Sequence, residues 1–396
     1  MRILVHDHSG HPFQVELSRE LARRGHQVTH SYTAAYVSGK GNLRSDPEIG
    51  LRVETVGRPK PVDNMRFISR LCREIVRGFL LTAEVVRRRP NVTLASNVQI
   101  PTLVVFAAAM WLLRRPWVLW HQDVYSVAVK SFAGQKLSKG FRLVAFAFSV
   151  AERWCARRAA AIVVIAPSFV PIHEEWGTAD KVVVIPNWAP LDEIVPVERD
   201  NAWGREHGLD DTFTLLYSGT LGLKHDPALM VGLTRHLIDA GRPARLVVVN
   251  EGPAVDVIRA EAARLDVPVT LLPYQPYERL PEVLGTGDAL IVLLDQAAGA
   301  FSVPSKTLSY LCAGRPIIGL LPAENLAADL ITRAGGRALP PSVDSLSEAA
   351  EWLVTLVDDP DMRAKLGRCS RELAEDEFAL AGCTDRFEQL LAREAR

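Results

Sequence analysis

Two lysines, Lys224 and Lys306, stand where a predicted strand gives way to a helix, and both positions suit an anionic ligand. Lys306 lies in the first turn of a predicted helix, which Pro304 indicates as the start and Gly314 as the end. Free N–H groups make that turn positive, so a cation there is mildly unfavourable unless an anion binds. Lys224 lies in YSGTLGLKHDP, a glycine-bearing loop that enters a helix. The pair predicts a bridged diphosphate; the alternative at either position is a solvated surface lysine.

The same loops disfavour several cofactors. GxxxxGK[ST] is absent, so the lysine loop is not a Walker A motif, and the absence of GxGxxG disfavours a nicotinamide cofactor. The acidic pair Asp210-Asp211 lies in a linker rather than at a strand exit. We therefore expect no obligatory metal.

Polar residues also follow the strands of the first half. His8 and His11 flank Gly10 after the first strand, and Asn97 follows NVTLA. His121, Gln122 and Asp123 leave a later strand together, which places an imidazole, an amide and a carboxylate at one point. Ligands of open parallel sheets bind at the carboxyl ends of strands, so these residues are candidates for a site. The alternatives are a polar loop around Gly10, and a His121 packed against Trp117 or Trp120 with Asp123 capping a turn.

The elements that position these residues alternate between strand and helix in both halves of the chain, which indicates α/β layering with parallel sheets. In the first half the expected strands are 2–10, 26–32, 91–97, 117–126, 160–168 and 181–189, and the expected helices are 12–25, 66–89, 100–116 and 140–159. In the second half the expected strands are 213–222, 245–253, 269–276 and 288–295, and the expected helices are 226–241, 254–265, 278–287, 304–313, 323–334, 346–358 and 360–395. The turn-rich stretch NWAPLDEIVPVERDN places the domain boundary near 190–205.

The composition is that of a globular protein: 396 residues, 48% hydrophobic and 23% charged, enough for two domains. Five scattered cysteines without a CxxC pair indicate a reduced, cytoplasmic protein without a zinc site, and MRILVHDHSG is not a secretory signal. The apolar run 100–113 has 14 residues, whereas a membrane span needs about 20.

Charge is unevenly distributed. Residues 1–190 hold 26 basic and 14 acidic residues, and residues 191–396 hold 20 and 32. The basic stretch with Arg66, Arg70, Arg73 and Arg77 has apolar residues interleaved, which suggests a peripheral contact with the inner face of an anionic membrane. The alternatives are arginines that cover ordinary core helices, and mutual attraction of the two halves; no motif supports nucleic-acid binding.

The order of these segments resembles retaining glycosyltransferases of family 4, which have the GT-B architecture, and among them bacterial enzymes of the colanic-acid and O-antigen type. The resemblance covers nearly the whole chain, and its segments include SGHPFQVELSRELARRGHQVT, WVLWHQDVYS, YSGTLGLKHDP, LLPYQPYERLP and VPSKTLSYLCAGRPII. It implies two facing Rossmann-like domains with a cleft between them: residues 1–195 for the acceptor, residues 196–375 for the nucleotide sugar, and a helix at 376–396 that packs back on the first domain.

The resemblance also implies roles for residues. The implied catalytic residues are His121, Asp123, Lys224 and Lys306. The implied donor-binding residues are Gly219, Thr220, Lys224, Glu251, Tyr274, Gln275, Val303, Pro304, Ser305 and Lys306. The implied acceptor-binding residues are His8, Gly10, His11 and Asn97. The sequence departs from the family at Phe301 and Ser309, where two glutamates are usual, and at Thr220, where an arginine is usual; alignment of Gln122 with the family's histidine also stays open.

The implied reaction moves a sugar, with retention and without an obligatory cofactor, from a nucleotide diphosphate sugar to a lipid-linked or glycan acceptor. A UDP-linked sugar is expected, and an N-acetylated sugar is one option that the resemblance leaves open. Lysines and helix dipoles would stabilise the departing diphosphate, so no covalent carboxylate is required. The alternatives are a soluble transferase acting on a small molecule, a nucleotide-sugar 2-epimerase, which the scarcity of acidic residues near 300–310 disfavours, and a non-catalytic sugar-nucleotide-binding protein.

Overall fold

The computed structural model describes residues 1–8, 12–33, 43–57, 67–122, 124, 139–209, 212–222, 225–296 and 306–395, with the side chains of residues 67, 68 and 139–142 excepted. The chain folds into two compact units. Unit 1 comprises Met1–Asn187 together with Leu380–Arg396, and unit 2 comprises Trp188–Ala379. The sequence predicts the first division after residue 195, and the structure has it after Asn187. The chain returns to unit 1 at Leu380, whereas the sequence predicts residue 376.

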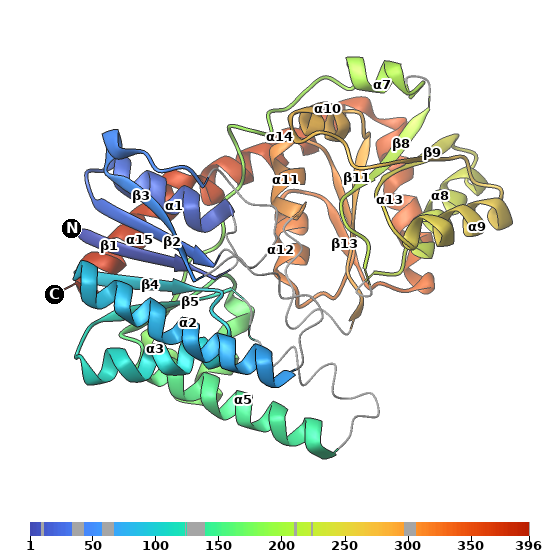
Figure 1. The fold of residues 1–396 in the computed structure, drawn as a ribbon. Helices are drawn as coiled ribbons and strands as arrows, with labels where there is room; N and C mark the ends of the chain where they lie inside the picture. Colours follow the sequence, from blue (N-terminus) through green and yellow to red (C-terminus); the bar gives the residue numbers. More distant parts are fainter. Residues whose placement is uncertain are drawn as a thin grey trace. The chain divides into compact units, whose positions relative to one another are not determined.

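Unit 1 is built on a seven-stranded sheet with the order β3-β2-β1-β4-β5-β6-β7, in which all named strands pair in parallel (Figure 1). The strands are β1 (Arg2–Asp7), β2 (Gln27–Thr33), β3 (Leu51–Val56), β4 (Val92–Ser96), β5 (Trp117–His121), β6 (Ala161–Val164) and β7 (Val182–Val184). The register places Asp7 of β1 beside Ser96 of β4, so these two strands end at the same level.

Helices α2 (Phe67–Arg88), α3 (Ile100–Leu112), α5 (Lys139–Arg158) and α6 (Val170–Trp176) cover one face of this sheet. Their inward residues, such as Leu81, Phe106 and Cys155, share one core with Leu4 and Leu119 of the sheet. This burial of apolar area is the main driving force for the packing of these amphipathic helices.

Helices α1 (Pro12–Arg23) and α15 (Leu380–Glu394) cover the opposite face. Trp120, adjacent to Leu119 and therefore on the other side of the pleat, packs against Phe387 of α15 with ring centroids 4.6 Å apart. Arg24 donates a hydrogen bond to Asp385 at 2.5 Å, and His26 lies 2.8 Å from Glu388. These contacts hold the C-terminal helix on unit 1.

Unit 2 is built on a six-stranded parallel sheet with the order β10-β9-β8-β11-β12-β13. The strands are β8 (Phe213–Ser218), β9 (Ala244–Val249), β10 (Val269–Leu272), β11 (Ala289–Leu293), β12 (Ile317–Leu320) and β13 (Arg337–Leu339). The helices are α7 (Ala202–Glu206), α8 (Ala228–Asp239), α9 (Ala254–Leu265), α10 (Leu280–Gly285), α11 (Lys306–Cys312), α12 (Leu326–Arg333), α13 (Leu346–Asp358) and α14 (Pro360–Phe378). Helices α8, α9 and α13 share the core on one face with Leu215 and Ile291.

The helix expected over 360–395 is in fact two helices. Ala379 has an extended backbone, with φ −65° and ψ 134°, and it separates α14 from α15. Phe378 is buried, and its carbonyl accepts a hydrogen bond from the Ala189 N–H at 2.8 Å. The break therefore coincides with the point at which the chain passes from unit 2 to unit 1.

Candidate functional site

The sheet of unit 2 has its topological switch point between β8 and β11. These strands are neighbours, and the chain continues from β8 to β9 on one side and from β11 to β12 on the other. Ligands of open parallel sheets bind outside the carboxyl ends of the strands at such a point. The residues there are Gly219, which follows β8, and Lys306, which opens the first helix described after β11.

Lys306 lies at this switch point, against the end of β8. Its ammonium group lies 3.8 Å from the centroid of the Tyr217 ring and is hydrogen-bonded to the Tyr217 hydroxyl. A Cβ placed on Gly219 would lie 3.3 Å from the same nitrogen, and Gly219 has a φ of +135°. Burial lowers the pKa of Lys306 to about 7. None of the contacts described for the Lys306 amine is with a carboxylate. An anionic ligand bound at the switch point would supply the missing negative charge.

Two tyrosines fix this arrangement. The Tyr310 hydroxyl of α11 accepts a hydrogen bond from the Ser218 N–H at 2.9 Å and donates one to the Ser218 carbonyl at 3.1 Å. Tyr217 donates to the carbonyl of Thr220 at 2.9 Å. Burial raises the pKa of both phenols, so each stays a neutral donor. Neither tyrosine was a predicted site residue.

The other donor-binding candidates of unit 2 form a network at the ends of β8, β9 and β10. Asn250 donates to the carbonyl of Gly219 at 2.9 Å, and Tyr274 donates its hydroxyl to Thr220 Oγ1 at 3.2 Å. Glu251 Oε1 accepts from the Tyr274 N–H at 3.1 Å. Three strand exits are thus tied into one polar rim.

Gln275 is placed differently from its neighbour Tyr274. Its Oε1 accepts from Trp203 Nε1 at 3.0 Å, and its amide donates to the Pro273 carbonyl at 2.9 Å. Its side chain is therefore engaged within unit 2, and its role in donor binding stays a prediction.

Several predicted site residues lie outside the described part of the chain. They are Gly10, His11, Asp123, Lys224, Val303, Pro304 and Ser305, together with Arg66 of the basic stretch.

The switch point of unit 1 lies between β1 and β4, and a buried charged cluster stands beside it. His8, which follows β1, has its Nε2 3.1 Å from Glu74 of α2. Arg77 forms an ion pair with the same carboxylate, and Thr102 donates to it at 2.8 Å. Burial by itself would raise the pKa of Glu74, but hydrogen bonds from His8 and Thr102 and the charge of Arg77 lower it to about 2.

This cluster corrects one expectation. Arg77 was assigned to a membrane-facing stretch, but only 7% of it is exposed, because it neutralises the buried Glu74. Arg70, by contrast, is exposed. His8 has no exposed surface, whereas Asn97 is 7% exposed and adopts a left-handed φ of 53°, which is uncommon outside glycine. Roles of His8 and Asn97 in acceptor binding remain predictions.

His121 ends β5 inside a second buried polar chain. Its Nε2 lies 3.2 Å from Glu152 of α5, and its Nδ1 lies 3.3 Å from Nε2 of His173. His173 in turn contacts Thr178 Oγ1 at 3.0 Å, and burial beside His121 lowers the pKa of His173 to about 3. The ring of His121 lies near that of Trp176, at 6.0 Å between centroids, and its packing against Trp117 or Trp120 stays a prediction. Its action on a sugar stays a prediction.

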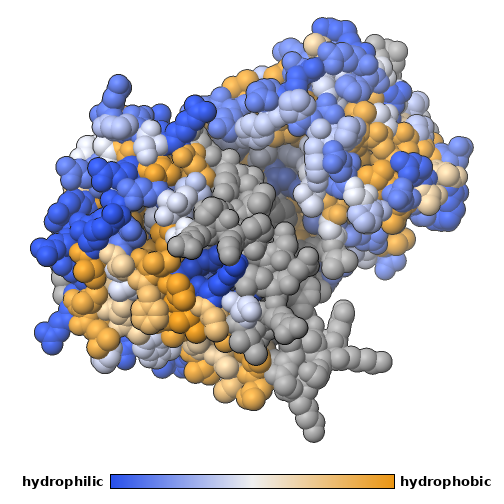
Figure 2. Space-filling view, in the orientation of Figure 1, coloured by the Kyte–Doolittle hydropathy of each residue, from blue (hydrophilic) through white to orange (hydrophobic). Residues whose placement is uncertain are grey.

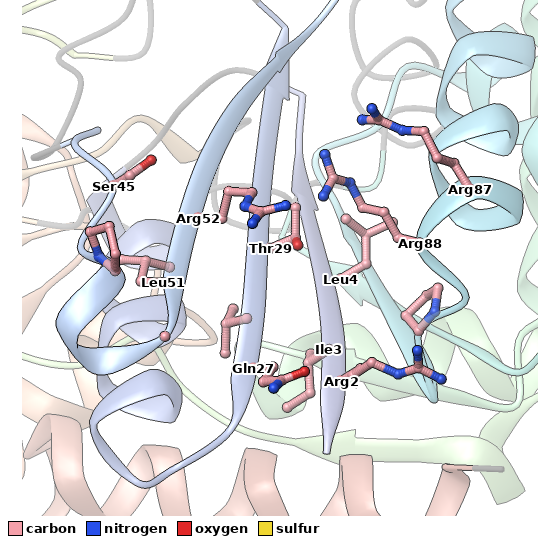
Figure 3. A pocket seen from close by; sticks show the side chains of 14 residues that line it. Arg2, Ile3, Leu4, Gln27, Thr29, Ser45, Leu51, Arg52, Arg87 and Arg88 are labelled. Carbon is pink, nitrogen blue, oxygen red and sulfur yellow. The ribbon is translucent and has the colours of Figure 1, made fainter.

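A cavity of about 670 Å³ lies elsewhere, at the amino ends of β1, β2 and β3 (Figure 3). Its lining includes the first residue of each strand, Arg2, Gln27 and Leu51. It is therefore distinct from the strand exits described above.

The described part of the chain holds neither a candidate membrane span nor a candidate metal site. None of the helices found there is both long enough and apolar enough to span a bilayer. No cluster of three or more histidine, cysteine, aspartate or glutamate side chains there has the arrangement of a metal site.

Comparisons with known proteins agree with this architecture. Residues 11–188 match the family model described as Glycosyl transferase 4-like domain. Alpha-D-kanosaminyltransferase of Streptomyces kanamyceticus is 24% identical over 185 residues, which are 46% of this chain and 46% of that protein. The match thus spans about half the length of that relative.

Solved structures extend the likeness to the whole chain. Sucrose-phosphate synthase from Thermosynechococcus elongatus superposes with a TM-score of 0.71 at 14% identity, covering 99% of this chain and 98% of that one. Anabaena HepE, solved in complex with UDP, gives a TM-score of 0.71 at 15% identity, covering 99% and 100%. The chain therefore has the GT-B fold of two Rossmann-like domains with parallel sheets, and residues 11–188 are similar to the glycosyl transferase 4-like domain.

Proposed function

We propose that this chain is a retaining glycosyltransferase that moves a sugar from a UDP-linked donor to a lipid-linked or glycan acceptor in cell-surface polysaccharide synthesis. The observation that carries the proposal is the placement of Lys306 beside Gly219 at the switch point of the unit 2 sheet. An amine confined there, hydrogen-bonded to a neutral phenol, is suited to meet the diphosphate of the donor.

The chemistry follows from charge. Cleavage of the bond between sugar and diphosphate leaves negative charge on the departing phosphate, and a fixed cation stabilises that charge as it develops. Lys306 would supply one such cation. Lys224, which lies outside the described residues, would supply a second. No resident cofactor is part of the proposal; the nucleotide sugar is a co-substrate.

The nature of the donor is inferred from relatives. HepE was solved with UDP and the sequence relative is named for transfer of an amino sugar, so UDP-linked sugars, N-acetylated ones included, are the first donors to test. The rim formed by Glu251 and the Tyr274 backbone would contact the nucleoside. Retention would appear as an α-linked product from an α-linked donor, which NMR of the product measures.

A second candidate is a soluble transferase that decorates a small molecule. The Streptomyces relative is named for the sugar that it transfers and not for a lipid acceptor, so it is compatible with this candidate. Transfer to a water-soluble acceptor without lipid or detergent would support this second candidate, and strict dependence on a lipid-linked acceptor would support the first. Donor binding without any transfer would identify a catalytically weak sugar-nucleotide-binding homologue.

The donor site is tested by thermal unfolding in the presence of UDP-, GDP- and dTDP-sugars. We expect one nucleotide class to raise the melting temperature, because a ligand that binds only the folded state stabilises it. Lys306→Ala should abolish that shift. Lys365→Ala, which removes an exposed lysine of α14, is the matched control and should leave it unchanged.

Two results would count against the proposal. If none of the donors raises the melting temperature, only the similarity to known proteins would support the transferase assignment. A shift that survives Lys306→Ala would remove Lys306 from the diphosphate site.

A further inference from the structure

Large apolar side chains are exposed mainly on one layer of unit 1. Of sixteen such exposed side chains among the described residues, eleven lie on α2, on α5, or on α3 with the residue after it. Phe79 and Val86 of α2, Trp111 and Leu112 of α3, and Leu143 and Phe146 of α5 represent them, with exposed fractions of 54–72%. We call the outer faces of these helices the α2–α3–α5 surface. Figure 2 shows a hydrophobic area over the part of unit 1 that contains them. Contiguous exposed apolar area of this kind marks an interaction site more often than scattered residues do.

The three helices lie next to one another, so their exposed residues form one surface. Helix α3 contacts α2 on one side and α5 on the other. Gly78 allows the first contact, because a Cβ at that position would lie 2.6 Å from Val105 Cβ. Within α5, Leu143, Phe146 and Val150 recur at helical spacing, so the helix presents an apolar stripe outward while its other side packs on the sheet.

The charges on this surface are almost entirely positive. Arg70, Arg114, Arg115, Arg157 and Arg158 are exposed, and Arg158 stacks over the Trp111 ring at 4.6 Å. The described parts of the three helices expose no carboxylate fully. Glu74 and Glu152 are buried, and the half-buried Glu84 accepts hydrogen bonds from Arg87 and Arg88.

A basic groove adjoins the C-terminal end of α2. It is the cavity of about 670 Å³ whose lining includes Arg2, Arg52, Arg87 and Arg88, and Val86 of the α2–α3–α5 surface directly precedes Arg87. Figure 3 shows Arg52 of β3 and Arg88 of α2 reaching into the groove from opposite sides of Thr29. Glu54 pairs with Arg87 and Arg88, whereas the lining of the groove itself holds four arginines and no carboxylate among the described residues.

We propose that the α2–α3–α5 surface binds the interface of an anionic phospholipid bilayer. Phe79, Leu112, Leu143 and Phe146 would enter the boundary between headgroups and acyl chains, where an amphipathic helix lies in the plane of the membrane. The surrounding arginines and the basic groove would contact lipid phosphates. The apolar contact distinguishes this proposal from adsorption by the basic stretch alone. It rests on the proposed function only for its biological role, which is to bring the enzyme to a lipid-linked acceptor.

Charge argues against a second copy of the chain as the occupant. A symmetric dimer through this surface would bring two arginine-rich faces together, and the described residues of the three helices expose no carboxylate fully to pair with them. An anionic bilayer offers the complementary charge as well as an apolar interior.

The test is flotation of the full chain with vesicles of phosphatidylcholine alone or of an equimolar mixture of phosphatidylcholine and phosphatidylglycerol. We expect binding to the anionic vesicles and at least about tenfold weaker binding by Leu112→Ser/Phe146→Ser, because two exposed apolar side chains no longer enter the bilayer. Val257→Ser/Val343→Ser is the matched control: both side chains are exposed in unit 2, at 49% and 70%, and the double variant should bind like the wild type.

A second measurement reports insertion directly. Trp111 is 56% exposed on the surface, so lipids brominated in their acyl chains should quench its fluorescence, and Trp111→Phe should remove most of that quenching. Absence of binding to either vesicle would overturn the proposal. Binding that high salt abolishes and that Leu112→Ser/Phe146→Ser leaves unchanged would also overturn it, because only electrostatic adsorption would remain. A dimer that dissociates in this variant would show a protein partner instead.

These outcomes are independent of the donor site. Nucleotide-sugar binding by thermal shift, measured on Leu112→Ser/Phe146→Ser and on Trp111→Phe, should match the wild type, since these residues lie in unit 1 and Lys306 lies in unit 2. Loss of vesicle binding with an intact thermal shift separates the surface from the proposed function. Vesicle binding without any thermal shift by nucleotide sugars would support the membrane-binding surface and count against the proposed function.

Discussion

Lys306 Nζ lies 3.8 Å from the centroid of the Tyr217 ring and 3.3 Å from the position that a Cβ on Gly219 would occupy. The lysine belongs to α11 and the tyrosine to β8, so the contact joins two elements that meet at the sheet's switch point. A cation on an aromatic face is stabilised modestly, while burial of the charge works against it. Burial dominates, and the pKa of Lys306 falls from 10.5 to about 7.

The first prediction concerns proton uptake on donor binding. Above pH 7 Lys306 is mainly neutral in the free protein, and a bound diphosphate should restore its charge. Affinity for UDP-glucose or UDP-N-acetylglucosamine should therefore fall as pH rises above about 7, by up to about tenfold per unit. Calorimetry in buffers of different ionisation enthalpy should detect uptake of nearly one proton at pH 8. A pH-independent affinity, or the same proton uptake in Lys306→Met, would contradict this assignment.

The same shift predicts a pH dependence of stability without ligand. Between the folded pKa of about 7 and the ordinary value of 10.5, the unfolded chain holds a proton that the folded chain has released. The free energy of unfolding should therefore rise with pH across this window relative to Lys306→Met, and this contribution should be lost as pH falls through 7. Urea titrations of both proteins at several pH values measure the difference. A constant difference between them would show that the lysine keeps its ordinary pKa.

The third prediction concerns Gly219. Its φ of +135° is unfavourable for other residues, and an added Cβ would meet the Lys306 ammonium at 3.3 Å. Gly219→Ala should lower the free energy of unfolding by about 1–3 kcal/mol and weaken donor binding. Gly222→Ala, in the same loop, is the control, because nothing lies within 4 Å of its Cβ position and its φ is not positive. Equal behaviour of the two variants would mean that the Gly219 conformation is not needed.

Most of this fold could be predicted from the sequence because the buried strands are short apolar runs between helices of helical periodicity. The edge strand β3 escaped prediction, since its pattern of burial is mixed and LRVETV alternates weakly. The break at Ala379 also escaped, because neither glycine nor proline marks it and the cause is a long-range contact between Phe378 and Ala189.

The sequence predicted residues of the donor site only where a charged side chain occupied an unusual position in an element. Lys306 stood out as a cation in a first helical turn, whereas Tyr217 and Tyr310 read as ordinary apolar positions of a strand and a helix. Their hydroxyl contacts join residues far apart in the chain, and no local pattern encodes them. Glu74 had a usable signal: it shares one helical face with the core residues Leu81 and Val85, where an exposed carboxylate is not expected.

The last prediction therefore addresses Glu74. Its carboxylate is buried between His8, Arg77 and Thr102, and removal of one partner of a buried ion pair leaves the other charge without compensation. Glu74→Gln should lower the free energy of unfolding by about 3–5 kcal/mol at neutral pH. Because the pKa of Glu74 is lowered from 4.5 to about 2, its contribution is fully present above about pH 4.5 and is lost as pH falls through 2. Urea titrations of wild type and variant should thus converge toward low pH. Glu84→Gln is the matched control on the same helix, and it should cost less because Glu84 is more exposed. A loss for Glu74→Gln no larger than that for Glu84→Gln would mean that the buried cluster does not carry an ionised carboxylate.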